Sequence, residues 1–275
     1  MKLNPKNEKI YREIFNWIIL DDIDNQNVHE IADRLGFQLS PDEIYLKSDW
    51  KKFKKFRVYG IGKDVLFYIK EIWELGAIKE VLAHKIGAYL DPDLLPANYV
   101  FGQYTSSGWL SKNPVPFLVT MTVPGHALKR KDVEANAFMF GRQYMYCKWL
   151  SLYDCNERHF FLGPDGFLRR IDLGLAFTQL NRPYQGFDVF FPKTIYENME
   201  FKRGVEFQRQ LSSMRFEVIF DDFLLELNAL KDLVEDELFD FNPVKFKTDL
   251  LEYWKREGIL NEFGRPQKIK RFLVL

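Results

Sequence analysis

The sequence contains few of the residues that stabilise small secreted proteins or bind zinc. Its 275 residues include only two cysteines, Cys147 and Cys155, and four histidines. Two cysteines match no zinc-ligand spacing and form no disulfide framework. This usage is typical of a protein from the reducing cytoplasm. The sequence therefore predicts a cytoplasmic protein without structural zinc or disulfides.

Long hydrophobic runs and an excess of one charge are also missing. The apolar run over residues 115–123 is far shorter than the ~20 residues that cross a membrane. The polar residues 1–8 lack the apolar core of a signal peptide. Lysines plus arginines number 39, as do aspartates plus glutamates, so no global attraction to nucleic acid is expected. We expect neither a membrane span nor nucleic-acid binding.

What the sequence does have is enough apolar material for a large core. Hydrophobic residues make up 47% of the chain, which suits one large domain or two small ones. Its clearest local positive cluster consists of Lys51, Lys52, Lys54, Lys55 and Arg57. We interpret this cluster as a solvated strand edge or turn.

The N-terminal region predicts two short helices. Asn4 followed by Pro5 is typical of a helix start, and apolar residues follow on one face: Ile10, Ile14, Trp17 and Ile18. Asn27 and Glu30 form a capping-box pattern for a second helix that ends at Gly36. That helix resembles the first half of a helix-turn-helix, but strand-like residues follow it. We expect a helical extension over residues 1–40 rather than a nucleic-acid module.

Residues 41–125 predict a compact α+β unit. The segments "FRVYGIG" and "DVLFYIKEI" are typical of two strands. The segment "LGAIKEVLAHKIGAYL" has apolar residues at helical spacing, and "NYVFGQY" and "PFLVTMTV" predict two more strands.

Residues 126–275 predict a larger and mainly helical unit. A helix over residues 132–153 is followed by a strand pair around Gly166 and by long helices over residues 205–238. Pro243 and Gly258 mark the start and the stop of the last helix. The fold class is therefore α+β, with a small mixed lobe and a larger helical lobe.

The segment most informative about chemistry is "LYDCNERHFFLGPDGFLRRIDLGLAF", residues 152–177. It places Asp154 after a helix and Asp172 after a strand pair. Phosphoryl transfer uses two such carboxylates, because one orients the acceptor hydroxyl and another holds the Mg²⁺ that bridges the phosphates. The segment therefore indicates a phosphotransferase.

This segment resembles the catalytic region of phosphatidylinositol 3/4-kinase-like and HipA-type kinases. Their pattern is Asp-Arg-His-x-x-Asn, a glycine turn, and then Ile-Asp-x-Gly. Asp154 and Asp172 take the two aspartate positions, and their interval, 172 − 154 = 18, is that of the family. The resemblance implies a two-lobed kinase fold that binds ATP with Mg²⁺ or Mn²⁺. Glu157 offers an alternative alignment for the catalytic base, but it shortens the interval to 15.

The resemblance extends upstream. Lys70 matches the lysine that contacts the α- and β-phosphates, and Glu80 matches the helix glutamate that orients it. Four further residues are implied as nucleotide contacts: Gly60 and Gly62 in a glycine turn, and Thr120 and Val123 at the strand and hinge between lobes.

One departure from the family pattern bears on activity. His159 occupies the position of the metal-binding asparagine. His159 is then a metal ligand that favours Mn²⁺, or Asn156 supplies the oxygen instead, or the second metal site is lost, or His159 is a structural residue. These four interpretations stay open.

We therefore predict an ATP- and metal-dependent phosphotransferase that acts on serine or threonine of a protein. The alternatives are a pseudokinase that binds nucleotide with little transfer, and a nucleotidyl transferase on the same fold. The aromatic residues Tyr184, Phe187, Phe190 and Phe191 suit either a substrate groove or core packing, of which we expect packing. No pattern in the sequence predicts an oligomeric state.

Overall fold

The computed structural model describes residues 5–49, 55–60, 64–72, 77–95, 99–107, 112–129, 131–186, 191, 193–230 and 241–267. The chain divides into two compact units. Unit 1 comprises Met1–Val81, Pro96–Thr122 and Asp232–Phe241, and unit 2 comprises Leu82–Leu95, Val123–Lys231 and Asn242–Leu275. Within the described residues, no helix is long and apolar enough to cross a membrane.

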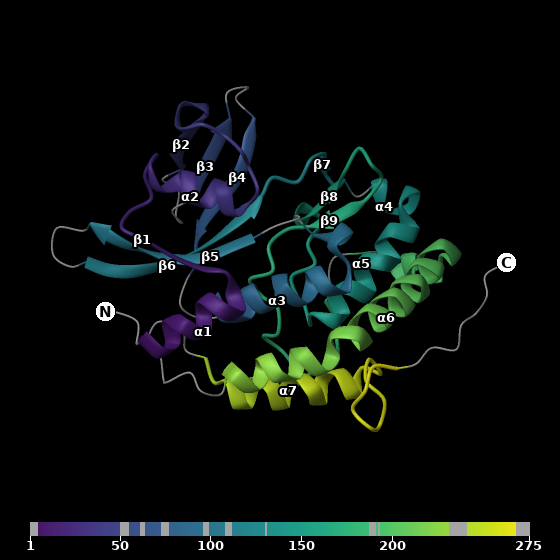
Figure 1. Cartoon of the computed structure of the whole chain (residues 1–275). Coiled ribbons are helices and arrows are strands. Elements are labelled where there is room, and N and C mark those ends of the chain that lie inside the picture. Colours follow the sequence, from purple (N-terminus) through teal and green to yellow (C-terminus); the bar gives the residue numbers. More distant parts are fainter. Residues whose placement is uncertain are drawn as a thin grey trace. The chain divides into compact units, whose positions relative to one another are not determined.

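Unit 1 is built on a mixed sheet of six strands in the order β1-β5-β6-β4-β3-β2 (Figure 1). Only β1 is parallel to its neighbour, β5, and the other pairs are antiparallel. The strands are β1 (Trp17–Leu20), β2 (Ile44–Asp49), β3 (Lys55–Gly60), β4 (Val65–Glu71), β5 (Tyr99–Ser107) and β6 (Lys112–Met121). The helices are α1 (Pro5–Phe15), α2 (Asn27–Arg34) and the short 3₁₀ helix η1 (Pro41–Glu43).

The core of unit 1 lies between α2 and one face of this sheet. Alternate residues of β3 and β4, among them Val58, Phe67 and Ile69, are buried together with Val28 and Ile31 of α2. Because side chains alternate across a strand, the intervening residues point to the opposite face. The sequence segments predicted to form strand, strand, helix, strand and strand do so in that order, which confirms the α+β class.

The N-terminal helix prediction was wrong at its end. The helix stops at Phe15, and Asn16 adopts a left-handed backbone with φ of 52°. Trp17 and Ile18, predicted on the helix face, instead form β1 and pair with Phe101 and Gly102 of β5. The apolar run "WIIL" suits a buried strand as well as a helix, so its spacing alone does not decide between them.

The predicted capping box at Asn27 is also wrong. Asn27 is the first residue of α2, not its cap, and its backbone N–H donates to Asp24 Oδ1 at 2.8 Å. Asp24 therefore satisfies a helix-start donor in place of the predicted pair. The chain continues from α2 through η1 into β2, and the described residues 35–49 contain no second α-helix.

Unit 2 combines helices with a small sheet in the order β7-β8-β9. Helix α3 (Ala77–Leu90) begins in unit 1 and continues into unit 2. The remaining elements are η2 (Pro92–Leu94), β7 (His126–Ala127), α4 (Asp132–Ala135), α5 (Ala137–Trp149), η3 (Glu157–His159), β8 (Phe160–Leu162), β9 (Leu168–Arg170), η4 (Lys193–Glu197), α6 (Met199–Leu230) and α7 (Pro243–Arg256). The sequence boundary predicted at residue 125 falls close to the change of unit after Thr122. The boundary predicted at residue 40 separates no units, because β1 and β2 belong to one sheet.

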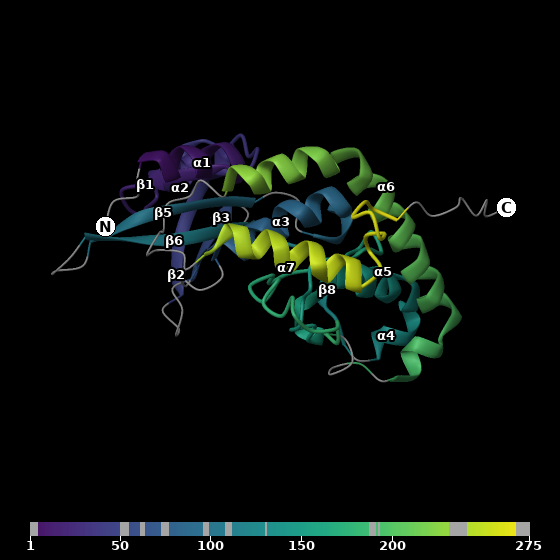
Figure 2. The same ribbon diagram turned by 90° about the horizontal axis from the view of Figure 1, so that it is seen from below.

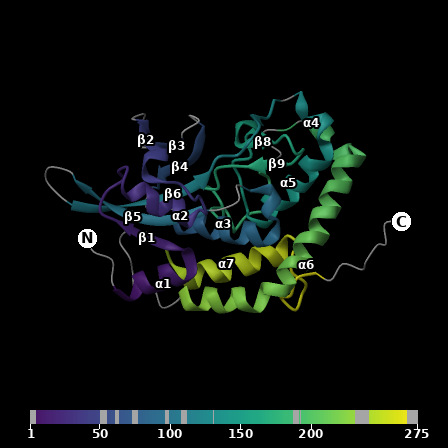
Figure 3. The same cartoon turned by 45° about the horizontal axis from the view of Figure 1, so that its top comes forward.

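Helix α6 is the longest element of unit 2, and it curves along its length (Figure 2, Figure 3). It begins at Met199 rather than at the predicted residue 205, and residues 231–238 of the predicted helices lie outside the described residues. It crosses α5 closely, because a Cβ at Gly204 would lie 1.9 Å from the carbonyl oxygen of Phe138. Only glycine permits that approach.

Several local predictions in unit 2 are confirmed. Gly166, with φ of 77°, turns β8 into β9. Asn242 caps α7 by accepting the backbone N–H of Lys245 at 2.9 Å, and Pro243 occupies its first turn. Gly258 ends the helix with φ of 68°.

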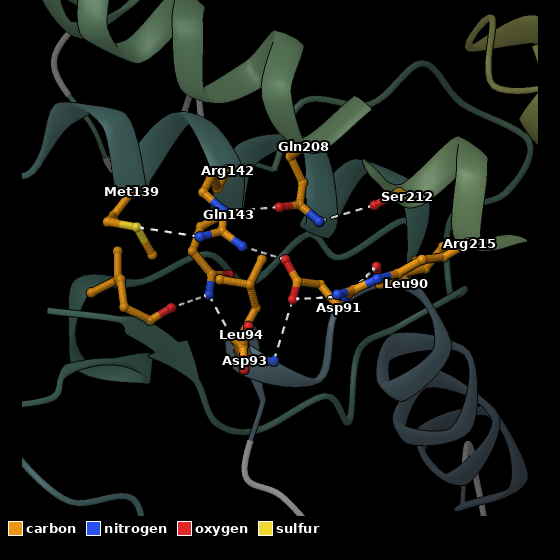
Figure 4. Close-up of polar contacts among 11 residues, drawn as sticks. Leu90, Asp91, Asp93, Leu94, Met139, Arg142, Gln143, Gln208, Ser212 and Arg215 are labelled. Atoms are coloured by element: carbon orange, nitrogen blue, oxygen red, sulfur yellow. Dashed lines mark hydrogen bonds and ion pairs between the residues drawn. The ribbon is translucent and has the colours of Figure 1, made fainter. Parts of the chain in front are cut away.

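A buried polar network joins η2 to helices α5 and α6 (Figure 4). Asp91 is fully buried, and its carboxylate lies 2.5 Å from Arg142 Nη2 and 3.2 Å from Arg215 Nη1. Arg142 also donates to Gln208, which in turn donates to Ser212. A buried carboxylate whose two oxygens both accept hydrogen bonds from arginines is a structural anchor, since its charge is paired.

The neighbouring Gln143 ties β9 to this frame. Its fully buried amide donates to the carbonyl oxygens of Leu168, at 2.5 Å, and Leu94, at 3.3 Å. Leu168 begins the strand that ends two residues before Asp172. Helix α5 therefore fixes the start of the strand that delivers this aspartate.

Candidate functional site

In unit 1, the predicted pair of Lys70 and Glu80 is formed. Lys70 lies near the end of β4, and Glu80 lies in the first turn of α3. The Lys70 Nζ and Glu80 Oε1 atoms are 3.5 Å apart, with the lysine side chain 38% exposed and the glutamate 4% exposed. The buried carboxylate needs this cation. The half-exposed ammonium keeps surface through which to contact an anion.

The nucleotide contacts predicted around this pair divide between the units. Gly60 is the buried last residue of β3, and Gly62 lies outside the described residues. Thr120 lies in β6 opposite Tyr68, in unit 1, whereas Val123 is buried and belongs to unit 2.

In unit 2, Asp154 lies in an irregular segment between α5 and η3. Its carboxylate is 32% exposed, and Oδ2 lies 3.6 Å from His159 Nδ1. Its carbonyl oxygen accepts hydrogen bonds from His159 Nδ1, at 3.1 Å, and from Arg170 Nη2, at 2.5 Å. These two hydrogen bonds fix the main chain of Asp154, while its side chain stays accessible.

Asp172 follows β9 with an unusual backbone. Its φ of 62° lies in the left-handed region, which is uncommon for a residue with a side chain. Its carboxylate is exposed, and Oδ1 accepts the backbone N–H of Gly174 at 3.3 Å. Four described residues other than glycine have positive φ; two of them, Asp172 and Phe177, lie within residues 152–177, and a third, Ser151, directly precedes that segment. Such strain concentrates at functional sites.

Arg170 connects the two aspartates, and sequence reasoning missed it. Its side chain is fully buried. A single nitrogen, Nη2, donates to the carbonyl oxygens of Asp154, at 2.5 Å, and Asp172, at 3.3 Å. Its guanidinium also lies over the Phe160 ring, 5.2 Å from the centroid. One buried cation therefore holds the main chain at both candidate acids.

The surroundings of Arg170 contain both cysteines. Cys147 and Cys155 are both fully buried. Burial raises the pKa of the Cys147 thiol, and its hydrogen bond with Cys155 raises it further. Burial also opposes ionisation of Cys155, but the hydrogen bond with Cys147 and the charge of Arg170 outweigh it, so the pKa of Cys155 is lowered. Tyr184, 3.5 Å from Cys155 Sγ through its hydroxyl, has a pKa raised well above 10 by burial.

His159 and Asn156, the predicted assisting metal ligands, both have roles within the loop. His159 is buried, and its Nδ1 lies 3.1 Å from the carbonyl oxygen of Asp154. In the tautomer that donates this hydrogen bond, Nδ1 carries the proton and Nε2 has the lone pair. The Asn156 side chain caps η3 by accepting the backbone N–H of Arg158 at 3.2 Å. Only Nε2 of a neutral His159 is therefore suited to a metal.

The implied metal, Mg²⁺ or Mn²⁺, needs donor atoms from side chains of the protein. Among the described residues, no group of three or more histidine, cysteine or acidic side chains is arranged to hold an ion. Mg²⁺ bound with a nucleotide needs fewer protein ligands, because one or two carboxylates and the substrate phosphates suffice. Asp172, exposed and ionisable, fits that requirement.

Two of the four aromatic residues considered after Asp172 pack in the interior rather than line an open groove. Tyr184 and Phe191 are both buried, which confirms the packing prediction for them. Phe187 and Phe190 lie outside the described residues.

Compared with known proteins, the chain matches no family model and no curated protein sequence.

Proposed function

We propose that the chain is an ATP- and divalent-metal-dependent phosphotransferase of the kinase-like type, which transfers phosphate to a serine or threonine of a protein. The observation that carries the proposal is the Lys70–Glu80 pair, with its 3.5 Å separation. Kinases need a lysine on the third strand paired with a glutamate on the following helix. Lys70 lies on the third of the successive antiparallel strands β2, β3 and β4, and Glu80 lies on the next helix.

In this proposal, the candidate residues of each unit have their own roles. In unit 1, Lys70 contacts the phosphates, and Glu80 keeps its ammonium in place. In unit 2, the accessible carboxylate of Asp154 orients the acceptor hydroxyl and takes its proton, and Asp172 holds the metal. The metal, when bound, neutralises charge that develops on the phosphates. Arg170 keeps both aspartates in place through their carbonyl oxygens.

The test measures whether the γ- or the α-phosphate of ATP is transferred to protein. The full chain is incubated with γ-labelled or α-labelled ATP and Mg²⁺ or Mn²⁺, beside Asp172→Ala. Asp221→Asn is the matched control, because Asp221 is an exposed aspartate of unit 2 on α6, away from the loop. We expect γ-label on protein with wild type and control, and none with Asp172→Ala. α-Label would instead mean nucleotidyl transfer.

A second candidate, a nucleotide-binding pseudokinase, is favoured by His159. Its Nδ1 contacts the carbonyl oxygen of Asp154, so a residue placed where the family has a metal ligand here supports the loop. Stabilisation by ATP that depends on metal, without transfer of either label, would select this candidate. Neither label nor stabilisation would reject both.

A further inference from the structure

Helix α6 carries a row of large apolar side chains on its solvent-facing side. Four of these side chains are between 47% and 82% exposed: Phe207, Met214, Val218 and Leu225. Their spacing of seven, four and seven residues places them within about 40° of one another around the helix axis and over a length of about 27 Å. We call these four residues the α6 stripe.

The packing of unit 2 does not account for the α6 stripe. The opposite side of the helix is buried and includes Phe216, Phe220, Phe223 and Leu227. These buried residues hold α6 in unit 2, whereas the stripe leaves most of its apolar surface in water. Single exposed apolar side chains are common on proteins, but a continuous row of them marks an interaction surface.

The spacing of the stripe is the same when it is read from either end, and this fits a second copy of the chain. Across a two-fold axis, residue i of one copy meets residue j of the other, and j meets i. In an antiparallel pair of α6 helices with the axis at the level of Phe216, Phe207 faces Leu225 of the partner subunit. Met214 then faces Val218 of the partner subunit, so that each apolar side chain meets another.

The charges along α6 favour the same antiparallel arrangement. Residues 199–210 include three basic and two acidic residues, and residues 211–230 include one basic and four acidic residues. When the residues with an ion pair are set aside, the exposed Lys202 remains in the first half, and the exposed Glu217 and Asp222 remain in the second. An antiparallel pair places the basic half of each helix beside the acidic half of the other, whereas a parallel pair places the two acidic halves together.

The curvature of α6 limits the size of this contact. A long helix curves with its solvent-facing side convex, and α6 curves along its length (Figure 3). Two copies therefore meet most closely at the middle of the stripe, at Met214 and Val218. A contact of one helix against another is smaller than a standard interface, so we expect weak association with a Kd of about 10–100 µM.

We propose that two copies of the chain form a weak homodimer through their α6 stripes, packed antiparallel about a two-fold axis. The formal net charge of zero leaves no long-range repulsion between the copies. The inference is independent of the phosphotransferase proposal, since association needs neither ATP nor metal.

The test measures sedimentation velocity of the full chain over protein concentrations from about 1 to about 300 µM, without ATP or metal. We expect the mass to rise from that of a monomer towards that of a dimer. Met214→Glu and Val218→Glu should each raise the Kd at least about 10-fold, because the two-fold axis places each new carboxylate twice in an apolar contact.

The matched control is Val244→Glu. Val244 is 62% exposed and lies on α7, also in unit 2 but outside the stripe, so its substitution should leave the Kd unchanged. Thermal unfolding at about 1 µM, where each protein is monomeric, checks that the variants are folded.

The orientation is tested with a short bis-maleimide on Phe207→Cys and Leu225→Cys, since both native cysteines are buried. We expect cross-linked dimer in a mixture of the two variants and little with either variant alone, because the two copies of residue 207 lie about 27 Å apart in an antiparallel pair. Three results would overturn the proposal: an equal rise of the Kd in the control, efficient cross-linking of Phe207→Cys alone, or a wild type that stays monomeric at all concentrations. The last would leave the stripe to a different protein.

Discussion

The candidate residues of unit 1 and those of unit 2 are held in different ways. Lys70 and Glu80 sit on regular elements, a strand and a helix, and meet through their side chains. Asp154 and Asp172 sit on irregular backbone, and Arg170 holds them through their carbonyl oxygens. Regular elements place side chains by the repeat of their backbone. Irregular backbone needs other hydrogen bonds to hold it, because its N–H and C=O groups are not paired as they are in a helix or sheet.

This difference separates two kinds of mutation. At Lys70 and Glu80, the side chain that would contact the ligand also makes the structural contact. At Asp154 and Asp172, the side chain is accessible to ligand, and the bonds to Arg170 are made by the main chain. The Asp172 carboxylate also accepts the backbone N–H of Gly174. A side-chain change at Asp154 should therefore alter chemistry with little effect on stability, and a change at Arg170 should alter both.

The largest effect is expected for Asp154→Asn. Loss of the base should slow γ-phosphate transfer about 1000-fold, because general base catalysis contributes about 10²–10⁴-fold. The free energy of unfolding should change by less than about 0.5 kcal/mol, as for a surface substitution, because the carbonyl bond to Arg170 is kept. Initial transfer rates and urea unfolding measure the two quantities. Transfer that persists in this variant, but is lost in Glu157→Gln, would move the base to Glu157.

A smaller effect on transfer, together with a loss of stability, is expected for Arg170→Met. The loss of the donor shared by two carbonyl oxygens should lower the free energy of unfolding by about 2 kcal/mol. Transfer should fall about 30-fold, while ATP affinity, which depends on Lys70, should stay within about 2-fold. Urea unfolding, transfer kinetics and ATP titration measure these quantities. The stability and the transfer rate of Arg170→Lys should lie between those of wild type and Arg170→Met, because one ammonium cannot reproduce the guanidinium fork.

A more stable Arg170→Met variant would contradict this account. It would mean that the cost of burying the guanidinium exceeds the value of its hydrogen bonds. Lost transfer with unchanged stability would instead mean that Arg170 acts on the loop without supporting the fold.

Glu80→Gln should act on ATP binding rather than on the loop. Without its carboxylate partner, Lys70 is less well oriented, so the KM for ATP should rise about 10-fold with a smaller change in kcat. The free energy of unfolding should change by less than about 1 kcal/mol, because the lysine is half exposed and water screens the pair. Steady-state kinetics against ATP concentration checks this split. A fall in kcat alone would place Glu80 with the loop residues and remove the contrast.

The same contrast explains how much of the molecule the sequence could predict. The strand of Lys70 and the helix of Glu80 follow from hydrophobic spacing, and the turn at Gly166 follows from local residue preference. The strand β1 does not follow from local spacing, because its partner in β5 lies more than 80 positions away, as the pairing of Trp17 with Phe101 shows. Spacing that is compatible with both helix and strand is resolved only by tertiary pairing.

Arg170 was missed for a related reason. In "FLRRID" it stands next to Arg169, and nothing in the sequence distinguishes the two. The structure turns Arg169 outward to pair with Asp165 at 2.6 Å and buries Arg170 beneath the aspartates. The alternation of a strand implies that one of them points inward, but not which one. That choice depends on the register of β9 against β8 and on the anchoring of Leu168 by Gln143.

The smallest effect is expected at Asp165, the partner of the outward-facing Arg169. The hydrogen bonds of Arg169 hold the pKa of Asp165 at about 2, below its ordinary 3.8. A lowered carboxyl pKa stabilises the folded state above about pH 3.8, and this contribution is lost as the pH falls towards 2. Asp165→Asn should therefore lower the melting temperature slightly near neutral pH and not at all below about pH 2. Differential scanning calorimetry of both proteins over that range measures the difference. A gap that persists in acid would show that Asp165 supports the turn by geometry, as Arg170 supports the loop, and not by its charge.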